Sequence, residues 1–393
     1  MGALLLAVAF VAVLLLRAGG DPSILVHAGP PWTHADEAPA SLTVQAADQA
    51  YDGQFFYRLG VSPWSTERIV GGVENDLPSL RNARWGFGAL AWVASGGDAD
   101  LVPWALIALN LGAAFAVGAL GGALARTSGR HTAWGLLFFL WPGFAYSLSL
   151  DTSELVASAF VLAGLLAARK RQGLGAAAAL TAAVLTRDTT AVVPFGFAIA
   201  GAWSMFGRAA VERAGSDVGR SPGREPGPMS GVRALATGAV PLAVFVIWQL
   251  VQRSRFGSLP LTSSGDNNLS GPLVGFVQEV GKLVPPGSGE EGFRLLFALG
   301  LVGVLVLGAW CFRRSQVPPP ERVAWVAAAG VVVLLSEVLW AGATAFMRAG
   351  TELGLMTTVV LLGTEIRLPR RLLAVGFTAG WLLTAVAQVT KIA

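Results

Sequence analysis

The chain has 393 residues, of which 54% are hydrophobic and only 13% are charged. A soluble globular domain carries about 25% charged residues, so this composition excludes an ordinary water-exposed surface and favours lipid as the solvent. The net charge is +4, and no block of basic residues with interleaved aromatics is present. Nucleic acid is therefore not an expected partner.

Apolar runs recur along the chain and predict an all-α integral membrane protein. A run of about 17 to 25 apolar residues is long enough to cross a bilayer. Counting slightly shorter runs as well, we expect about eleven spans in a single membrane domain, residues 1–393. The first run is short, so a signal peptide is its alternative interpretation. The predicted spans are residues 2–16, 101–125, 132–150, 153–168, 174–185, 190–206, 234–251, 294–312, 323–345, 350–363 and 372–389.

Four segments between the spans have a distinct composition. Residues 17–83 lack a long apolar run and predict a large first external loop. Residues 84–95 are apolar but too short to span, which favours an interfacial helix. Residues 207–233 contain Ser-Pro-Gly and Pro-Gly-Pro, which predict a cytoplasmic linker. Residues 253–293 are rich in proline and predict a second external loop.

The positions of arginine and lysine predict the orientation. With the N-terminus in the cytoplasm, every second short loop is rich in arginine, and most acidic residues fall on the other side. Cytoplasmic loops of membrane proteins carry such an excess of basic residues. We therefore expect a multi-pass protein of the plasma (inner) membrane, with residues 17–83 outside the cytoplasm.

The sharpest motif is the Tyr-Asp-Gly-Gln-Phe-Phe-Tyr-Arg segment, residues 51–58. Gly53 lacks a Cβ, which lets a ligand approach Asp52 closely. Arg58 is a candidate for binding a phosphate. An acid that takes a proton and an arginine that holds a phosphate are what sugar transfer from a lipid phosphate needs. The alternative is an aromatic interfacial helix with a solvated aspartate. The neighbouring candidate substrate-binding residues are Tyr51, Gln54 and Tyr57.

A second acidic group lies upstream, in His34-Ala35-Asp36-Glu37. Asp36 and Glu37 could form a second acid/base centre or, with the histidine, a weak site for a divalent metal. Three such groups are an incomplete ligand set, so a solvated turn is the alternative. No cofactor signature is present, and a divalent metal is the one cofactor that this pattern allows.

Further charged residues lie beside the predicted spans, near their outer ends. Ionisable residues at membrane depth are costly, so a functional role is the default hypothesis. The alternatives are snorkelling anchors for the arginines and helix capping for the acids. All of them converge on the side of the first external loop. The candidates are Arg81, Arg84, Asp151, Glu154, Arg187, Asp188 and Arg348.

These motifs together resemble the polytopic glycosyltransferases of the C superfamily (GT-C), in particular their bacterial membrane members. The segment 51–58 is similar to their Asp-Gly-Gln-aromatic-Tyr signature, and 76–92 to the arginine-flanked segment that leads into their second span. Leu185-Thr186-Arg187-Asp188 resembles a Leu-Thr-Arg-Glu pattern, and Phe256-Gly257-Ser258-Leu259-Pro260 a Phe-Gly-x-x-Pro pattern. Ser62-Pro63 departs from the family's usual Asp-Pro.

The resemblance implies an enzyme that uses a polyprenyl-phosphate sugar as donor and a cell-envelope glycan or protein as acceptor. It implies Asp52 as the base for the acceptor hydroxyl, and Arg84, Arg187 and Arg348 as ligands of the donor phosphate. Two alternatives stay open at this point. One is a transporter or flippase for a lipid-linked sugar, which would need charges throughout the bundle and internal repeats. The other is a non-catalytic membrane assembly factor with the same fold.

Overall fold

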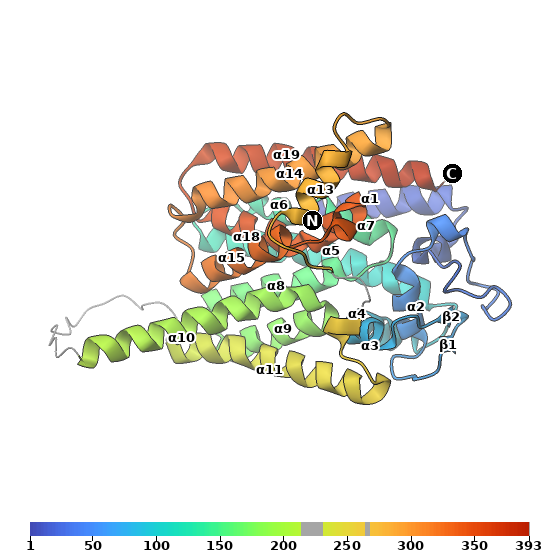
Figure 1. The fold of residues 1–393 in the computed structure, drawn as a ribbon, viewed down its shortest axis with the longest axis horizontal. Coiled ribbons are helices and arrows are strands. Elements are labelled where there is room, and N and C mark those ends of the chain that lie inside the picture. The colour runs from blue at the N-terminus through green and yellow to red at the C-terminus, as the bar shows by residue number, and fades with distance from the viewer. Residues whose placement is uncertain (214–230, 264–267, 393) are drawn as a thin grey trace.

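The computed structural model describes residues 1–213, 231–263 and 268–392. Over these residues the chain is helical apart from a short antiparallel hairpin of β1 (Ile69–Val70) and β2 (Val73–Glu74). The predicted all-α class is therefore confirmed. The long helices lie along the long axis of the molecule, and the N-terminal loop with its hairpin gathers at one end (Figure 1).

Five helices of the described residues are long and apolar enough to cross a membrane. A sixth crossing would come from α17 (Ala343–Ala349) and α18 (Thr351–Leu362), which meet at 50°. Such helices are what a multi-pass membrane protein requires. The five are α5 (Val102–Thr127), the stretch Asp188–Phe206 formed by the 3₁₀ helix η4 (Asp188–Ala191) and the start of α10 (Val192–Arg213), α11 (Gly231–Phe256), α14 (Gly289–Phe312) and α19 (Arg367–Lys391).

The outward faces of these helices carry large apolar side chains. Trp203 on α10 is 80% exposed, and Val375 on α19 is 70% exposed. Apolar surface in water costs about 25 cal/mol per Å², a cost that contact with hydrocarbon removes. The inward faces pack around buried aromatic residues such as Trp141, Phe144 and Phe346. The bundle thus has an apolar core and an apolar surface.

The expected number of about eleven spans is not confirmed. Two of the predicted spans are broken into short helices. Pro142 lies at one break, where a proline lacks the N–H that a continuous helix needs. Residues 132–150 form η3 (Thr132–Gly135), α6 (Leu136–Phe139) and α7 (Gly143–Ser149), while 323–345 fall in α15 (Pro319–Val333), α16 (Glu337–Trp340) and the start of α17.

Three further predicted spans are helices, but short ones. They are α1 (Gly2–Arg17), α8 (Glu154–Arg169) and α9 (Gly173–Thr186), with 16, 16 and 14 residues. At a rise of about 1.5 Å per residue they reach about 21 to 24 Å, less than a hydrocarbon core of about 30 Å. Apolar composition identified these helices correctly, but it did not establish that each one crosses a membrane.

The first external loop, predicted at 17–83, contains several short elements. They are η1 (Pro22–Val26), η2 (Ala47–Gln49), α2 (Gly53–Val61), the hairpin and α3 (Pro78–Ala83). The predicted interfacial segment 84–95 forms α4 (Trp85–Ser95), which packs against α2 and α5.

The other two predicted segments are partly helical. The segment 253–293 holds the end of α11, α12 (Pro260–Ser263), α13 (Val274–Lys282) and the start of α14, with 264–267 outside the described residues. Helix α10 extends to Arg213 and α11 begins at Gly231, so both ends of the predicted linker 207–233 are helical. Its middle, 214–230, lies outside the described residues.

Two glycines hold the external elements against the bundle. A Cβ on Gly53 would lie 2.5 Å from the carbonyl oxygens of Val26 and Leu150, so the start of α2 packs directly on the turn between α7 and α8. A Cβ on Gly86 would lie 2.5 Å from Thr186 Oγ1, so α4 begins against the end of α9. Only glycine permits these approaches. They bring residues near 52, 84, 151 and 187 to one end of the molecule.

Candidate functional site

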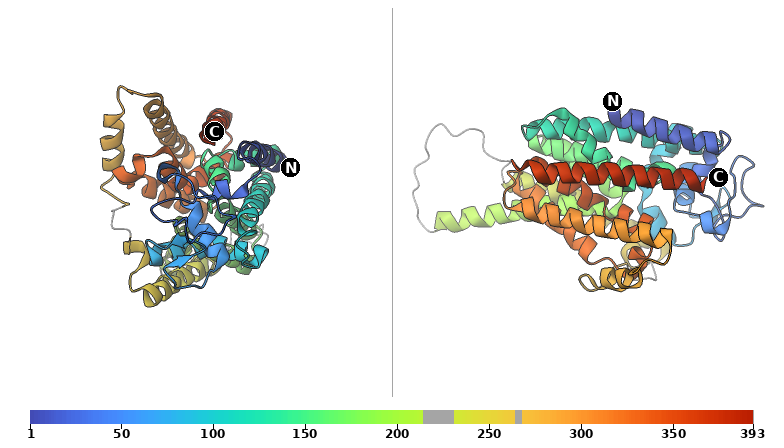
Figure 2. Two further views of the ribbon diagram at one scale, coloured as in Figure 1. Left: turned by 90° about the vertical axis from the view of Figure 1, so that its right-hand side faces the viewer. Right: turned by 90° about the horizontal axis from the view of Figure 1, so that it is seen from above.

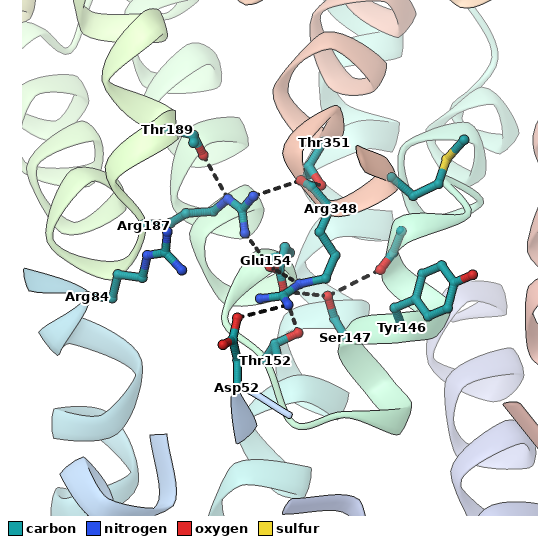
Figure 3. A network of polar contacts seen from close by, with 12 residues as sticks. Asp52, Arg84, Tyr146, Ser147, Thr152, Glu154, Arg187, Thr189, Arg348 and Thr351 are labelled. Atoms are coloured by element: carbon teal, nitrogen blue, oxygen red, sulfur yellow. Dashed lines mark hydrogen bonds and ion pairs between the residues drawn. The ribbon is translucent and has the colours of Figure 1, made fainter. Parts of the chain in front are cut away.

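Asp52 stands at the start of α2, with a carboxylate held between two arginines. Its Oδ1 accepts from Arg81 Nη1 at 2.9 Å, and its Oδ2 accepts from Arg348 Nη1 at 3.0 Å. Arg81 lies in α3, whereas Arg348 lies in α17, 296 positions after Asp52 in the sequence. The Asp52 side chain is 25% exposed. It therefore combines two strong ion pairs with access from outside, and Figure 3 shows it at the edge of the network.

Glu154 lies deeper and joins two arginines. Its Oε1 accepts from Arg348 Nε at 2.7 Å and from Arg187 Nη1. Its Oε2 accepts from Ser147 Oγ at 2.9 Å and from Thr152 Oγ1. The Glu154 side chain is fully buried. One carboxylate oxygen therefore places both guanidiniums, and the two hydroxyls hold the other oxygen (Figure 3).

Arg187 follows α9 and connects this network to α17 and α18. Its Nη2 donates to the Arg348 carbonyl oxygen at 2.7 Å, and its Nε donates to Thr189 Oγ1 at 2.7 Å. Glu352 Oε1 lies 3.3 Å from the same Nε and accepts from Thr189 Oγ1 at 2.9 Å. Glu352 Oε2 has no hydrogen-bond partner among the described residues. The bend between α17 and α18 is thus fixed by polar contacts.

Arg84 is the least engaged arginine of the group. Its Nε lies 3.4 Å from Asp188 Oδ1, and that Nε donates no hydrogen bond within the described part of the chain. Arg81, in contrast, contacts Asp76 through Nε at 2.9 Å and Nη2 at 3.1 Å in addition to Asp52. Arg84 is 25% exposed and therefore has donor capacity left for a ligand.

Three arginines shape the acidity of Asp52. Burial raises the pKa of its carboxyl, but Arg348, Arg81 and Arg84 lower that pKa by more. The net result is a pKa well below the ordinary value of 3.8, so Asp52 is ionised at neutral pH. An ion that replaced the carboxylate on Arg348 would remove part of this effect and make Asp52 more basic.

Tyr51 lies beside this group. The Arg348 guanidinium carbon lies 5.0 Å from the centre of its ring, a cation–π distance. Gln54 is buried and accepts from Thr33 Oγ1 at 2.7 Å, so it holds the loop together. Tyr57 is fully buried, and its hydroxyl has no partner among the described residues. Of the three aromatic and amide candidates, the structure brings only Tyr51 into the network.

Arg58 lies apart from the network. It is 2% exposed, and its Nη2 donates to the carbonyl oxygen of Glu67 at 2.5 Å. Burial lowers its pKa to about 10, and nearby Glu67 raises it only in part. The helical turn of α2 directs it away from Asp52, so the ionic environment predicted around residues 51–58 is supplied by Arg81 and Arg348 instead.

Asp36 and Glu37 are exposed on the loop, and neither is part of the network. The histidine of that motif, His34, contacts Glu74 at 2.9 Å rather than either acid. Among the described residues, no three histidine, cysteine, aspartate or glutamate side chains form a group that could hold a metal ion.

Asp151 occupies an unusual place between α7 and α8. Its φ of 43° lies in the left-handed region, and its side chain is fully buried. Neither carboxyl oxygen has a hydrogen-bond partner among the described residues, and burial raises its pKa well above the ordinary value. A protonated acid suits this place. Asp151 therefore lies in the turn beneath Gly53 and forms no ion pair with the arginines among the described residues.

The sequence analysis missed two acidic members of the network. Glu352 follows Arg348 by four residues, a spacing that places both on one helix face. Asp76 precedes Arg81 by five residues across a turn with Pro78. Glu352 is an acidic residue inside the apolar run that begins at residue 350, and this position was the signal that could have identified it. Glu337, by contrast, is half exposed and lies 3.8 Å from Lys282, outside the network.

Comparison of the chain with protein-family models, with curated proteins and with solved structures found no match.

Proposed function

We propose that the protein is a membrane glycosyltransferase of the GT-C type, which moves a sugar from a polyprenyl-phosphate donor to an acceptor hydroxyl. The observation that carries the proposal is the position of Arg348, whose guanidinium lies between the carboxylates of Asp52 and Glu154. A partly open acid thus adjoins a buried group of arginines. These are the two components that transfer from a lipid phosphate needs, a proton acceptor and a cationic phosphate site.

The proposed reaction is a single displacement at the anomeric carbon. The acceptor oxygen forms a bond to that carbon, and the bond from the carbon to the donor phosphate oxygen breaks with its electron pair on that oxygen. The hydroxyl proton moves to Asp52. The polyprenyl phosphate gains negative charge, which Arg84, Arg187 and Arg348 neutralise.

Phosphate binding and basicity are coupled in this proposal. Arg348 Nη1 donates to Asp52 Oδ2 at 3.0 Å. A phosphate that competes for Arg348 raises the pKa of Asp52, because it removes one of the charges that lower it. The base therefore becomes stronger only when the donor is bound. Asp52 thus takes up a proton less readily until a donor phosphate competes for Arg348.

An apolar groove beside Arg348 fits a lipid-linked donor. A cavity of about 300 Å³ lies between α14 and α19, and Met347, the residue before Arg348, is part of its wall. Trp141, Phe297 and Phe377 also line it. Trp141 Nε1 donates to the Met347 carbonyl oxygen at 3.1 Å, which fixes the wall next to the arginine. An isoprenoid tail in this groove would carry its phosphate toward the network.

We further propose that residues 17–83 and the site lie outside the cytoplasm, at the plasma membrane. The distribution of arginines between the loops supports this orientation. The acceptor would then be a cell-envelope glycan or protein.

A transfer assay tests the proposal. Purified wild type, Asp52→Asn and the control Asp36→Asn are placed in liposomes with a panel of radiolabelled polyprenyl-phosphate sugars and cell-envelope extract as acceptor. We expect release of free polyprenyl phosphate by wild type and Asp36→Asn, and a loss of about 10²- to 10⁴-fold for Asp52→Asn. Full activity of folded Asp52→Asn would overturn the assignment of the base. Inactivity of all three folded proteins would favour a transporter or an assembly factor.

A further inference from the structure

A cavity with many polar lining residues adjoins the network at Tyr51. Its volume is about 690 Å³, and it is bounded by the ends of α1 and α19, by residues 45–51 and by Thr344 of α17. The C-terminal ends of α1 and α19 lie near each other in both perpendicular views (Figures 1 and 2). The cavity therefore stands where two helices end beside the external loop.

The cavity wall carries amides and a hydroxyl. Gln45, Gln49, Gln388 and Thr344 contribute to it. Gln45 Nε2 donates to the Ile24 carbonyl oxygen at 2.6 Å. The Gln388 Oε1 accepts from a buried serine, Ser149, at 3.1 Å. Both side chains are thus held in place by one contact. Amide groups in fixed positions are suited to bind the hydroxyls of a polyol.

The charges of the wall favour an anion. Arg17, at the end of α1, and Lys391, in the last turn of α19, both line the cavity and are exposed. Asp48 is the acid that lines it. His27 is neutral at pH 7, because burial lowers the pKa of its imidazole and the nearby Lys391 adds to that effect, whereas backbone contacts raise it only in part. The wall thus carries one more positive than negative charge.

Tyr51 joins the cavity to the network. Its ring lines the cavity, and the Arg348 guanidinium lies 5.0 Å from the ring centre. Asp52 is the next residue in the chain. A molecule in the cavity therefore contacts Tyr51, the residue whose ring lies beside Arg348, whereas the apolar groove for the donor tail adjoins Met347.

We propose that this cavity binds the acceptor, and that the acceptor is an anionic, hydroxyl-rich headgroup held by Arg17 and Lys391. One of its hydroxyls would pass Tyr51 to reach Asp52. The assignment of the bound molecule as acceptor depends on the proposed glycosyltransferase function. The binding of an anionic polyol does not, and it can be tested without a donor.

The test uses photoactivatable phosphatidylinositol in liposomes that contain the full-length protein. We expect labelling of residues that line the cavity, and competition by soluble inositol phosphate but not by neutral inositol. Arg17→Glu and Lys391→Glu each lower labelling at least about tenfold, which corresponds to about 1.4 kcal/mol. Lys170→Glu is the control. Lys170 is an exposed lysine directly after α8, at the end of that helix away from Glu154. Thr344→Trp, which fills the cavity, lowers labelling without changing its charge.

The experiment distinguishes a soluble phosphate ligand from the headgroup of a membrane lipid. Competition by soluble inositol phosphate supports a site for the headgroup alone, and labelling that only vesicle-bound lipid provides supports a site for a membrane lipid. Labelling outside the cavity, equal competition by neutral inositol, or unchanged labelling of the folded Glu variants would overturn the proposal. A protein that binds the probe but consumes no donor contradicts the glycosyltransferase function alone. One that transfers sugar with no dependence on Arg17 or Lys391 contradicts the acceptor site alone.

Discussion

Both ends of the bundle bury ion pairs between arginine and glutamate, but they do so differently. At the end away from the proposed site, Arg169 Nε and Nη2 donate to the two oxygens of Glu321 at 2.7 and 2.6 Å. Its Nη1 donates to Thr127 Oγ1, Ser128 Oγ and the Leu124 carbonyl oxygen. This guanidinium has a partner for every nitrogen. At the other end, one oxygen of Glu154 serves two arginines.

The difference separates a structural pair from an adaptable one. Opening a bidentate pair whose donors are all satisfied costs free energy, because both charges stay buried without partners. Such a pair therefore holds its two helices in one position. In the network around Arg348, acceptors are shared, and Glu352 Oε2 and Arg84 Nε lack hydrogen bonds among the described residues. A phosphate can replace one shared carboxylate at lower cost. Cavity size alone does not distinguish the two ends. A cavity of about 810 Å³ borders Arg169 and Glu321, and it is larger than the cavity of about 690 Å³ at Tyr51.

The largest effect is expected from Arg348→Met. The change removes the cation that we propose for the donor phosphate, and with it the contacts to both Asp52 and Glu154. Transfer should fall by about 10²- to 10³-fold, the usual result of losing one donor to a developing negative charge. Steady-state kinetics on the folded fraction measure it, with Arg348→Lys as a partial replacement. Turnover within a factor of about two of wild type would refute the role of Arg348.

Arg169→Met should affect stability instead. It leaves Glu321, 1% exposed, without its cation, and breaking a buried pair costs about 3 to 5 kcal/mol. Unfolding in detergent by denaturant measures the loss, and turnover per folded molecule should stay unchanged. The double variant Arg169→Met/Glu321→Leu should recover most of the stability. Loss of turnover without loss of stability would contradict the structural role of this pair.

A smaller effect is expected from Arg81→Met on the pH dependence. Arg81 lowers the pKa of Asp52, so its removal moves that pKa up toward the ordinary 3.8. Transfer needs ionised Asp52, and the acid limb of the rate profile should therefore shift to higher pH by about one unit. The stability that ionised Asp52 contributes is present above pH 3.8 and is lost as pH falls toward its depressed pKa. An acid limb that does not move would exclude Asp52 as the titrating group.

The smallest effect is expected from Asp36→Asn combined with Glu37→Gln. Both side chains are exposed and distant from the network. Surface substitutions of this kind change the free energy of unfolding by about 0.5 kcal/mol or less. Transfer should stay within about twofold of wild type. A drop of tenfold or more, measured in the same assay, would restore these residues as candidates for a second acid/base centre or a metal site.

Sequence patterns predicted some features of this molecule for clear physical reasons. Apolar runs identified the helices, because side chains that contact lipid must be apolar whatever the fold. The pairing of Asp52 with Arg348 could not be predicted, since it depends on where the tertiary fold places α17 relative to the start of α2, and the two residues are 296 positions apart in the sequence. Arg58, the candidate phosphate ligand, contacts Glu67 and lies apart from Asp52, because proximity in sequence does not fix the direction of a side chain on a helix.

The expected number of spans is not confirmed for a related reason. Composition cannot distinguish a continuous helix from one broken near Pro142, nor a crossing from a short buried helix such as α8. Pro142 was the one local signal for a break in that region.

The central claim is that Asp52 acts as a base while its arginines bind the donor phosphate. Donor affinity and turnover of Asp52→Asn, measured together in liposomes, test it most directly. Removing the negative charge frees Arg348 and Arg81, so the variant should bind the polyprenyl-phosphate sugar as tightly as wild type or up to about tenfold more tightly, and transfer should fall by about 10²-fold or more. Weaker donor binding with transfer at the wild-type maximal rate would contradict the claim.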